Sequence, residues 1–289
     1  MGELPLYVKL LNFAFVVIYL VSVTLESTRG EILGTLRDLS MTGRALLANF
    51  IIVPILGFFL IRLFDLPPEI RLGFFLLALS PGGFFALQFA RVSKGNRVLA
   101  VALLVLLSVV AVVLTPVLTT VFFPLHTGRM PFTWLVILLL MVIAVPLLAG
   151  RALQQLIPEI APKLGRFLGA LSIVLFIMGA VSAGKYKTPA IKVLGMEGIA
   201  VIVMLCIGSW IVGWLLGGPE LRNRKVFAIA TSMRNVGVCL PIVINYFPGT
   251  EVIAPILAFS GISIPMNMVF ALVTGWALRD PVAPSGTRQ

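Results

Sequence analysis

Ala230-Thr231-Ser232-Met233-Arg234-Asn235-Val236-Gly237 places one charge inside an apolar run that extends from residue 226 to residue 247. If this run spans a membrane, Arg234 and Asn235 lie near its middle, where an arginine costs about 2.5–3.5 kcal/mol on insertion scales. Chains tolerate such a residue where it faces protein, water or a ligand. Gly237 weakens the helix just behind it. A polar, glycine-containing break in an apolar helix predicts the binding site of a membrane transporter.

The composition of the whole chain predicts a membrane protein. Its 289 residues are 60% hydrophobic and 11% charged, too few charges to cover a soluble protein of this length. The net charge of +11 comes from Lys and Arg between apolar runs, which is typical of topology-setting charges. We therefore predict a lipid bilayer as partner and no nucleic acid. The sequence has no motif for nucleotide, zinc or triad chemistry, so we predict neither an enzyme nor a cofactor.

The apolar runs predict a single all-α membrane domain over residues 1–289, with about nine spans of about 20 residues each. The spans fall near residues 8–25, 43–63, 72–91, 97–124, 132–150, 167–184, 197–217, 226–247 and 251–278. Fourteen Lys and Arg residues then lie on one side and seven on the other. The excess places the C-terminus in the cytoplasm and the N-terminus outside the cell membrane. Lys185, Lys187 and Lys192 form an outer basic cluster, expected to be a solvated loop or, alternatively, an anion attractor.

Two pairs of spans share a plan. Ser80-Pro81-Gly82-Gly83 interrupts the third span as residues 232–237 interrupt the eighth, and each broken span is followed by a tight connection and a long apolar helix. The predicted topology gives the two units opposite orientations. This pattern predicts an inverted-repeat transporter, with residues 43–124 in the first repeat and residues 167–278 in the second.

Several motifs carry a family resemblance. They are Leu66-Pro67-Pro68-Glu69-Ile70, Ser80-Pro81-Gly82-Gly83, Lys94-Gly95-Asn96, Leu114-Thr115-Pro116 and Met233-Arg234-Asn235-Val236-Gly237. The chain resembles the bile acid:sodium symporter family from about residue 11 to residue 278, although the family commonly shows Met-Gln-Asn-Ser-Gly in the last motif. The resemblance implies a core domain with two crossed broken helices, a panel domain, and transport by alternating access. Bacterial relatives have ten helices, and this chain is expected to start at their second.

The sequence departs from the family where sodium binds. The resemblance implies one sodium site built from side-chain oxygens, and the matching positions here are Ala86, Leu87, Ala100, Leu104 and Ala230. A second implied site uses a Glu and two Gln side chains, whose positions hold Ala230, Asn49 and Arg234. A hard cation is not held by hydrocarbon side chains. We therefore expect no metal site and no sodium coupling, with the Arg234 charge in place of the ion.

The expected substrate site surrounds the crossing of the two broken helices. The predicted substrate-binding residues are Arg234, Asn235, Asn49, Pro81, Gly82, Gly83, Phe84 and Ser263. Arg234 either binds an anion directly or acts as a structural counter-charge bound to helix-end carbonyls. Asn235 either faces substrate or makes an interhelical hydrogen bond. Pro81 to Gly83 either end a half-helix, whose partner's positive N-terminus suits a carboxylate, or form a simple kink.

These observations predict a secondary-type transporter of small organic anions, either bile-acid-like molecules or other amphipathic carboxylates. Phe84 and Phe85 replace small polar residues of relatives, so they either narrow the cavity or line it for an apolar moiety. Two alternatives remain open at this point. One is a sodium-coupled symporter with rebuilt sodium sites, and the other is a non-transporting sensor or receptor on the same fold.

Overall fold

The computed structural model describes residues 5–27, 29–122 and 132–278, and within them the chain forms helices and no strand. The first half contains α1 (Leu6–Leu25), α2 (Arg29–Leu36), α3 (Leu39–Leu47), the π-helical turn η1 (Ala48–Ile52), α4 (Val53–Leu63), α5 (Pro68–Ala78), α6 (Ala86–Val92) and α7 (Arg97–Phe122). The second half contains α8 (Phe132–Leu156), α9 (Ala161–Leu216), α10 (Leu221–Ser232), α11 (Val236–Tyr246) and α12 (Ile253–Ala277). The protein is an all-α membrane protein, as predicted.

The helices account for the predicted spans. Six segments of the described chain are long and apolar enough to cross a membrane, and they include α1, the continuous run α3–η1–α4, and α12. The helix α8 and the broken pairs α5–α6 and α10–α11 lie at the three remaining predicted spans. Two features differ from the prediction: the short helix α2 was not expected, and α8 continues to Leu156 rather than ending near residue 150.

The prediction of a loop between the sixth and seventh spans is wrong. Residues 185–194 continue the helix α9, which turns only at Gly195, where φ is 62° and ψ is −170°. Glycine adopts this backbone conformation without the steric penalty that a side chain brings. The cluster Lys185, Lys187 and Lys192 is therefore helical, and the Lys192 side chain is exposed. Hydropathy alone ended the span too early because the Lys residues that follow the apolar stretch look like a loop in composition.

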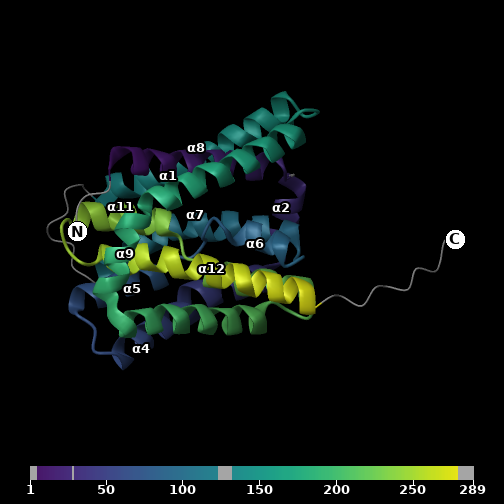
Figure 1. Cartoon of the computed structure of the whole chain (residues 1–289). Coiled ribbons are helices and arrows are strands. Elements are labelled where there is room, and N and C mark those ends of the chain that lie inside the picture. The colour runs from purple at the N-terminus through teal and green to yellow at the C-terminus, as the bar shows by residue number, and fades with distance from the viewer. Residues whose placement is uncertain (1–4, 28, 123–131, 279–289) are drawn as a thin grey trace.

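The helices form two groups that pack around opposite parts of α9. The first segment of α9 (161–194) packs against α1, where the Ser22 hydroxyl donates to the Gly165 carbonyl at 2.8 Å, and α8 packs on α1 as well. The second segment (196–216) packs against α10 and α12, where Trp210 Nε1 donates to Asn267 Oδ1 at 2.9 Å. Figure 1 shows α1 and α8 together on one side of the molecule, with α12 and α4 on the other. The predicted division into inverted repeats stays a prediction.

The two broken helices meet at their breaks. The Asn235 N–H donates to the Ser80 carbonyl at 2.6 Å and the Gly83 N–H donates to the Met233 carbonyl at 3.2 Å, so the two breaks pair as a short antiparallel bridge. A side chain on Gly83 has no room, because a Cβ there would lie 2.8 Å from the Arg234 carbonyl oxygen. This contact confirms the expected crossing of the two breaks.

Side chains of α7 satisfy the backbone that the first break exposes. The Thr115 hydroxyl donates to the Leu79 carbonyl at 2.7 Å, and the Ser108 hydroxyl donates to the Gly82 carbonyl at 3.3 Å. Backbone carbonyls at membrane depth have no water to bind, so an interrupted helix is stable only where neighbours replace its hydrogen bonds. The polar residues of the otherwise apolar α7 therefore hold the first break open.

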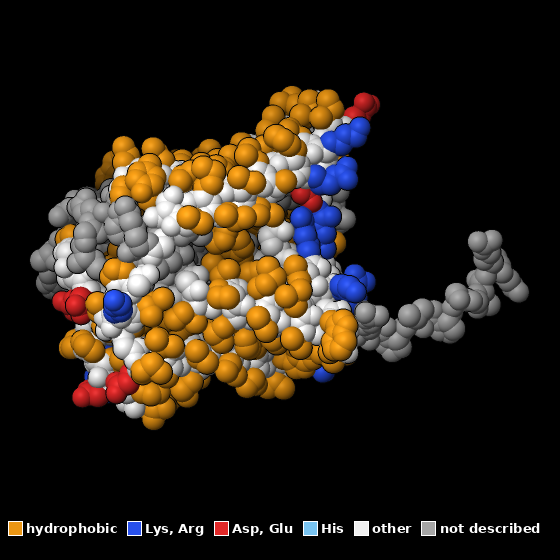
Figure 2. Space-filling model, in the orientation of Figure 1, with side chains coloured by type: hydrophobic (Ala, Val, Ile, Leu, Met, Phe, Trp, Pro, Cys, Tyr) orange, Lys and Arg blue, Asp and Glu red, His pale blue; other side chains and the backbone are white. Residues whose placement is uncertain are grey.

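The outer surface fits a lipid environment. Hydrophobic side chains cover most of the visible face along the length of the helices, whereas Lys and Arg gather at one end (Figure 2). Large apolar side chains such as Phe59, Trp276 and Leu215 are 65–75% exposed on α4, α12 and α9. Exposed apolar area on this scale is stable against lipid and not against water. The protein is a multi-pass membrane protein.

Candidate functional site

The Arg234 side chain lies at the centre of the crossing. Arg234 is 2% exposed, and its guanidinium donates Nη1 to the Ala78 carbonyl at 3.3 Å and Nη2 to Asn49 Oδ1 at 3.4 Å. The same Nη2 contacts the Thr231 carbonyl at short range. In the described part of the chain, no carboxylate pairs with Arg234. The charge is therefore held by neutral oxygens.

These oxygens belong to the ends of two half-helices. Ala78 is the last residue of α5, and Thr231 is the second-last residue of α10. The last carbonyls of a helix lack intrahelical partners and carry a partial negative charge. Two such helix ends converge on the guanidinium from both sides of the crossing. The convergence creates a place that favours a positive charge, and a residue of the chain fills it.

Asn49 supplies the third oxygen from a π-helical turn. It lies in η1, is 1% exposed, and its Nδ2 donates to the Ala45 carbonyl at 3.0 Å and to Thr231 Oγ1 at 3.4 Å. These two donations turn the amide oxygen toward Arg234. A π-turn inside an α-helix is rare and occurs frequently at functional sites. The turn thereby joins the second predicted span, residues 43–63, to the crossing.

The positions that the family resemblance assigns to sodium are lined by hydrocarbon. Ala86, Leu87, Ala100, Leu104 and Ala230 are all buried, with exposed fractions of 4% or less. They lie on α6, α7 and α10 around the crossing. Among the described residues, no group of three His, Cys, Asp or Glu side chains could hold a metal ion. The Ala78 and Thr231 carbonyls and the Asn49 amide oxygen could serve a cation here, and Arg234 already uses them.

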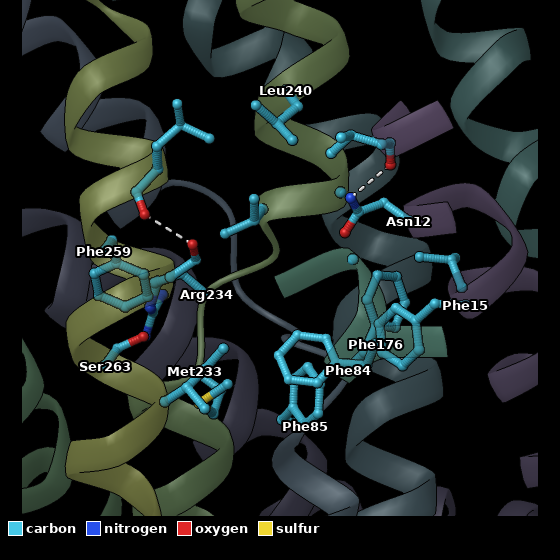
Figure 3. A pocket seen from close by; sticks show the side chains of 18 residues that line it. Asn12, Phe15, Phe84, Phe85, Phe176, Met233, Arg234, Leu240, Phe259 and Ser263 are labelled. Carbon is cyan, nitrogen blue, oxygen red and sulfur yellow. Dashed lines mark hydrogen bonds between the residues drawn. The ribbon is translucent and has the colours of Figure 1, made fainter. Parts of the chain in front are cut away.

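A cavity of about 130 Å³ lies beside the crossing, between the two helix groups. Its lining comes from α1 and the first segment of α9 on one side, and from the two breaks, α11 and α12 on the other. Most of its wall is apolar, and its polar groups come from Asn12, Ser260, Ser263 and Arg234. In Figure 3 the Arg234 side chain lies on the Phe259 and Ser263 side of the cavity, away from the aromatic rings opposite. The cavity suits a largely apolar ligand with few polar atoms.

The aromatic wall of the cavity is tightly packed. The Phe15 and Phe85 rings stack at 5.4 Å, and the Phe85 and Phe176 rings lie 4.0 Å apart. Phe84 meets Phe15 edge to face at 6.3 Å. These rings come from α1, α9 and the first break, so they join the two helix groups and close the cavity on that side (Figure 3).

Three buried polar atoms near the crossing have no partner among the described residues. They are Arg234 Nε, Asn235 Nδ2 and Ser263 Oγ. Arg234 and Ser263 both line the cavity. An unpaired buried donor costs about 1–3 kcal/mol, so such atoms mark a place where water or a ligand completes the hydrogen bonding.

The residues predicted from the sequence fall into two sets. Phe84, Arg234 and Ser263 line the cavity. Pro81, Gly82, Gly83 and Asn235 form the crossing itself, and Asn49 lies behind it against Arg234. The Asn235 side-chain oxygen accepts from the Val238 N–H at 3.2 Å, so it caps α11. The structure thus separates the residues that face the cavity from those that shape it.

Apart from Ser263, sequence reasoning missed the part of the wall that α1, α9 and α12 contribute. Asn12, Phe15, Phe176 and Phe259 belong to this part. Apart from Lys9 near its start, Asn12 is the only strongly polar residue of the predicted span 8–25, and this was a usable signal. The phenylalanines carried none, because an apolar residue in a membrane helix faces lipid, protein or a cavity without any difference in sequence.

A second missed feature is an ion-pair cluster at the other end of α1. Glu26 caps α1, and its carboxylate accepts from Arg91 at 2.9 Å and, at short range, from Arg97. The Glu26 side chain is only 6% exposed, and Ser22 and Gly165 hold it against α9. The cluster therefore joins the group formed by α1, α8 and α9 to α6 and α7. At 1.5 Å per residue along α1, it lies about 20 Å from the cavity residue Asn12.

Comparison with known proteins supports the structural observations. The model of the Sodium Bile acid symporter family matches residues 13–209, which is more than half of the chain. The "Probable sodium/metabolite cotransporter BASS1, chloroplastic" of Arabidopsis thaliana is 25% identical over 76% of this chain and 55% of its own length. The hepatic sodium/bile acid cotransporter of Rattus norvegicus is 25% identical over 80% of this chain and 65% of its own length.

A bacterial relative shows the same level of similarity. The uncharacterized sodium-dependent transporter YocS of Bacillus subtilis is 26% identical over 66% of this chain and 60% of its own length. The chain thus spans less than two thirds of the length of these three relatives, and each of them is named as a transporter or cotransporter. With a family model matched over most of an all-α membrane fold, the chain belongs to the sodium bile acid symporter family.

Proposed function

We propose that this protein transports small organic anions, amphipathic carboxylates above all, across the cell membrane by alternating access and without coupling to sodium. The observation that carries the proposal is the Arg234 guanidinium, bound by Ala78, Thr231 and Asn49 oxygens at the crossing. The protein supplies a fixed positive charge where relatives are expected to bind a mobile one.

Sodium fits this arrangement poorly. The side chains of Ala86, Ala100 and Ala230 offer no oxygen, and the Ala78 and Thr231 carbonyls at the two helix ends are already used by the guanidinium. A sodium ion about 4–5 Å from Arg234 would be repelled by roughly 3–4 kcal/mol at an effective dielectric near 20. Sodium binding would therefore require the arginine to leave, and the crossing would lose three hydrogen bonds with it.

The cavity supports an anionic ligand with an apolar body. The first turn of α11 faces it through Val236 and Gly237, and a helix N-terminus carries a partial positive charge. Ser263 Oγ and Arg234 Nε, both without partners among the described residues, lie at the same wall. A carboxylate would accept from these donors while hydrocarbon contacts the phenylalanine side. The expected ligand class is an amphipathic carboxylate. A bile acid, which appears in the name of the rat relative, belongs to this class.

The two helix groups support alternating access. The cavity lies between them at one end of α1, and the Glu26 ion pairs join them at the other end. If one helix group rocks against the other, the ion pairs break and the Glu26 end opens. The end that holds the cavity closes in the same movement. Charged pairs at the boundary of two rigid groups favour one of two discrete arrangements. The predicted orientation places the Glu26 end in the cytoplasm.

A sodium test separates this function from its main alternative. The purified protein is melted with octanoate and with cholate in sodium chloride or choline chloride of equal ionic strength, and uptake of each is measured in proteoliposomes. We expect both carboxylates to raise the melting temperature equally in the two salts, since a ligand stabilises by RT ln(1 + [L]/Kd). Uptake should follow the carboxylate gradient alone.

The names of the relatives favour a second candidate, a sodium-coupled symporter. A melting temperature that rises with sodium and not with choline, together with uptake driven by a sodium gradient, would establish that candidate in place of the proposal. Binding without uptake in either salt would identify a sensor on the same fold.

A further inference from the structure

The cavity beside the crossing is called the central cavity below. A second cavity continues it toward the lipid. It has a volume of about 250 Å³ and lies between α1, α8 and α11. Asn12, Val16, Phe84, Gly237 and Leu240 line both cavities, so the two share a wall. We call this space the side cavity.

The side cavity is almost wholly apolar. Beyond the shared wall it is lined by Phe13 of α1, by Val142 and Ile143 of α8, and by Val238, Pro241 and Ile244 of α11. Phe13 is 52% exposed and Ile244 is 37% exposed, although both lie within membrane-spanning helices. The side cavity therefore reaches the surface that faces lipid, and its lining has no charged group to hold a carboxylate.

The packing around the central cavity favours extension of an elongated ligand toward α8 rather than toward α9. Toward α9 the central cavity ends at the packed rings of Phe15, Phe85 and Phe176. Toward α8 it meets the side cavity at Phe84 and Gly237. Phe84 packs directly on Gly237, where an added Cβ would lie 3.0 Å from Phe84 Cε2. Gly237 thus allows the Phe84 ring to stand at the junction of the two spaces.

The volumes of the two cavities also indicate that one ligand occupies both. Ligand sites for molecules of drug size occupy about 300–1,000 Å³. The central cavity of about 130 Å³ falls below this range by itself, and so does the side cavity of about 250 Å³, whereas the two joined reach it. An amphipathic molecule of drug size therefore needs both.

We propose that the side cavity binds the apolar portion of the carried anion while its carboxylate stays at the first turn of α11, so that the protein selects monocarboxylates with an unbranched or elongated apolar body. This inference rests on the proposed function, because it assigns the second half of the same ligand. Phe84 is the residue that determines specificity, since its ring stands where the hydrocarbon passes from one cavity into the other.

The test is the dependence of affinity on chain length. The purified full chain is titrated with acetate, butanoate, hexanoate, octanoate and decanoate, and with octanamide as an uncharged counterpart of octanoate. Burial of one methylene is worth about 0.8 kcal/mol, which is a factor of roughly three to four in Kd. We expect affinity to rise by that factor per methylene once the chain enters the side cavity, and octanamide to bind at least tenfold more weakly than octanoate.

Two variants fill the side cavity from opposite walls, and a third is a matched control. Val142→Trp on α8 and Ile244→Trp on α11 both place an indole in the space; Ile244 is already part-exposed, so its variant keeps the test open if Val142→Trp does not fold. Val145→Trp makes the same change one helical turn further along α8, where Val145 is 50% exposed and outside the side cavity. We expect the first two to abolish the gain from butanoate to octanoate, and Val145→Trp to retain it.

The outcomes separate the inference from the function on which it rests. Binding and uptake of carboxylates without any dependence on chain length, or an equal dependence in Ile244→Trp and wild type, would overturn the inference and leave the proposed function standing. Equal binding of octanamide and octanoate would overturn both the inference and the anion selectivity of the proposed function, because the two cavities would then hold any lipid-like chain. Failure of every carboxylate to bind would overturn the proposed function itself.

Discussion

Arg234 Nη2 donates to Asn49 Oδ1 at 3.4 Å, which joins the break of one helix to a π-helical turn 185 residues away in the sequence. With the Ala78 and Thr231 carbonyls, this contact surrounds the guanidinium with oxygens and no carboxylate among the described residues. An ion bound by helix ends would meet the same surroundings.

Arg234→Ala should destabilise the protein. The substitution leaves three buried carbonyl or amide oxygens without their donor, and hydrogen bonds to a charged group are worth about 1.5–3 kcal/mol. We expect the melting temperature to fall and octanoate binding to weaken at least tenfold. Arg234→Lys keeps the charge but not the planar fork, so it should recover part of the loss. Wild-type stability and affinity in both variants would show that Arg234 is a tolerated residue and that the anion binds elsewhere.

Arg234→Gln should not confer a response to sodium, whereas the double variant Ala230→Glu/Arg234→Gln should. Gln restores one neutral ligand, but a hard cation prefers several oxygens with at least one carboxylate, which only the Glu supplies. The measurement is the melting temperature of each variant in sodium chloride and in choline chloride. A sodium response already present in wild type, or absent from the double variant, would contradict the idea that the arginine occupies the place of the ion.

Gly83→Ala should separate the two breaks. The added Cβ would lie 2.8 Å from the Arg234 carbonyl and 2.8 Å from Met233 Cβ, and real Cβ atoms do not approach so closely. We expect loss of uptake and a lower melting temperature. Gly34→Ala on α2 is the control, because a Cβ there meets nothing within 4 Å and alanine favours a helix. Equal behaviour of the two variants would show that the close approach of the breaks is not needed.

Glu26→Gln should loosen the end of the bundle that carries the ion pairs. The change removes the charge shared by Arg91 and Arg97, and leaves two cations facing each other at the boundary of the helix groups. We expect faster maleimide labelling of a cysteine at Val101, which lines the small cavity beneath Glu26, in a background without Cys206 and Cys239.

The control for Glu26→Gln is Asp65→Asn. Asp65 pairs with Arg71 at 3.2 Å, but the aspartate is fully exposed, and exposed pairs contribute about 0–1 kcal/mol. Labelling at Val101 should not change in this variant. Unchanged labelling in Glu26→Gln as well would remove the ion pairs from the proposed conformational switch.

The orientation of the chain is open to a labelling experiment. A cysteine at Met196, 80% exposed beside the turn of α9, should react with an impermeant reagent added to intact cells. A cysteine at Ile160, 57% exposed between α8 and α9, should react only after the cells are opened. The charge count predicts this result, since Arg151, Lys163 and Arg166 surround residue 160. The reverse labelling pattern would invert the proposed topology.

The sequence alone determined the class of fold and the position of its two breaks. The apolar runs are long because a helix must cross about 30 Å of hydrocarbon. Pro81 and Gly82 interrupt one of these runs, and the polar stretch around Arg234 interrupts another. Hydropathy predicts the spans because every side chain that faces lipid must be apolar. It failed at residues 185–194, since a helix that continues past the apolar run looks like a loop in composition.

Only the tertiary structure decided what each of these residues faces. Arg234 could have pointed at a substrate or at helix ends, and the convergence of Ala78, Thr231 and Asn49 turns its guanidinium to the helix ends. Phe84 joins two cavities and Phe176 closes one of them, although both are apolar residues in apolar runs. Hydrophobicity is a property of one residue, whereas a cavity and a hydrogen-bonded charge depend on the relative positions of segments far apart in the chain.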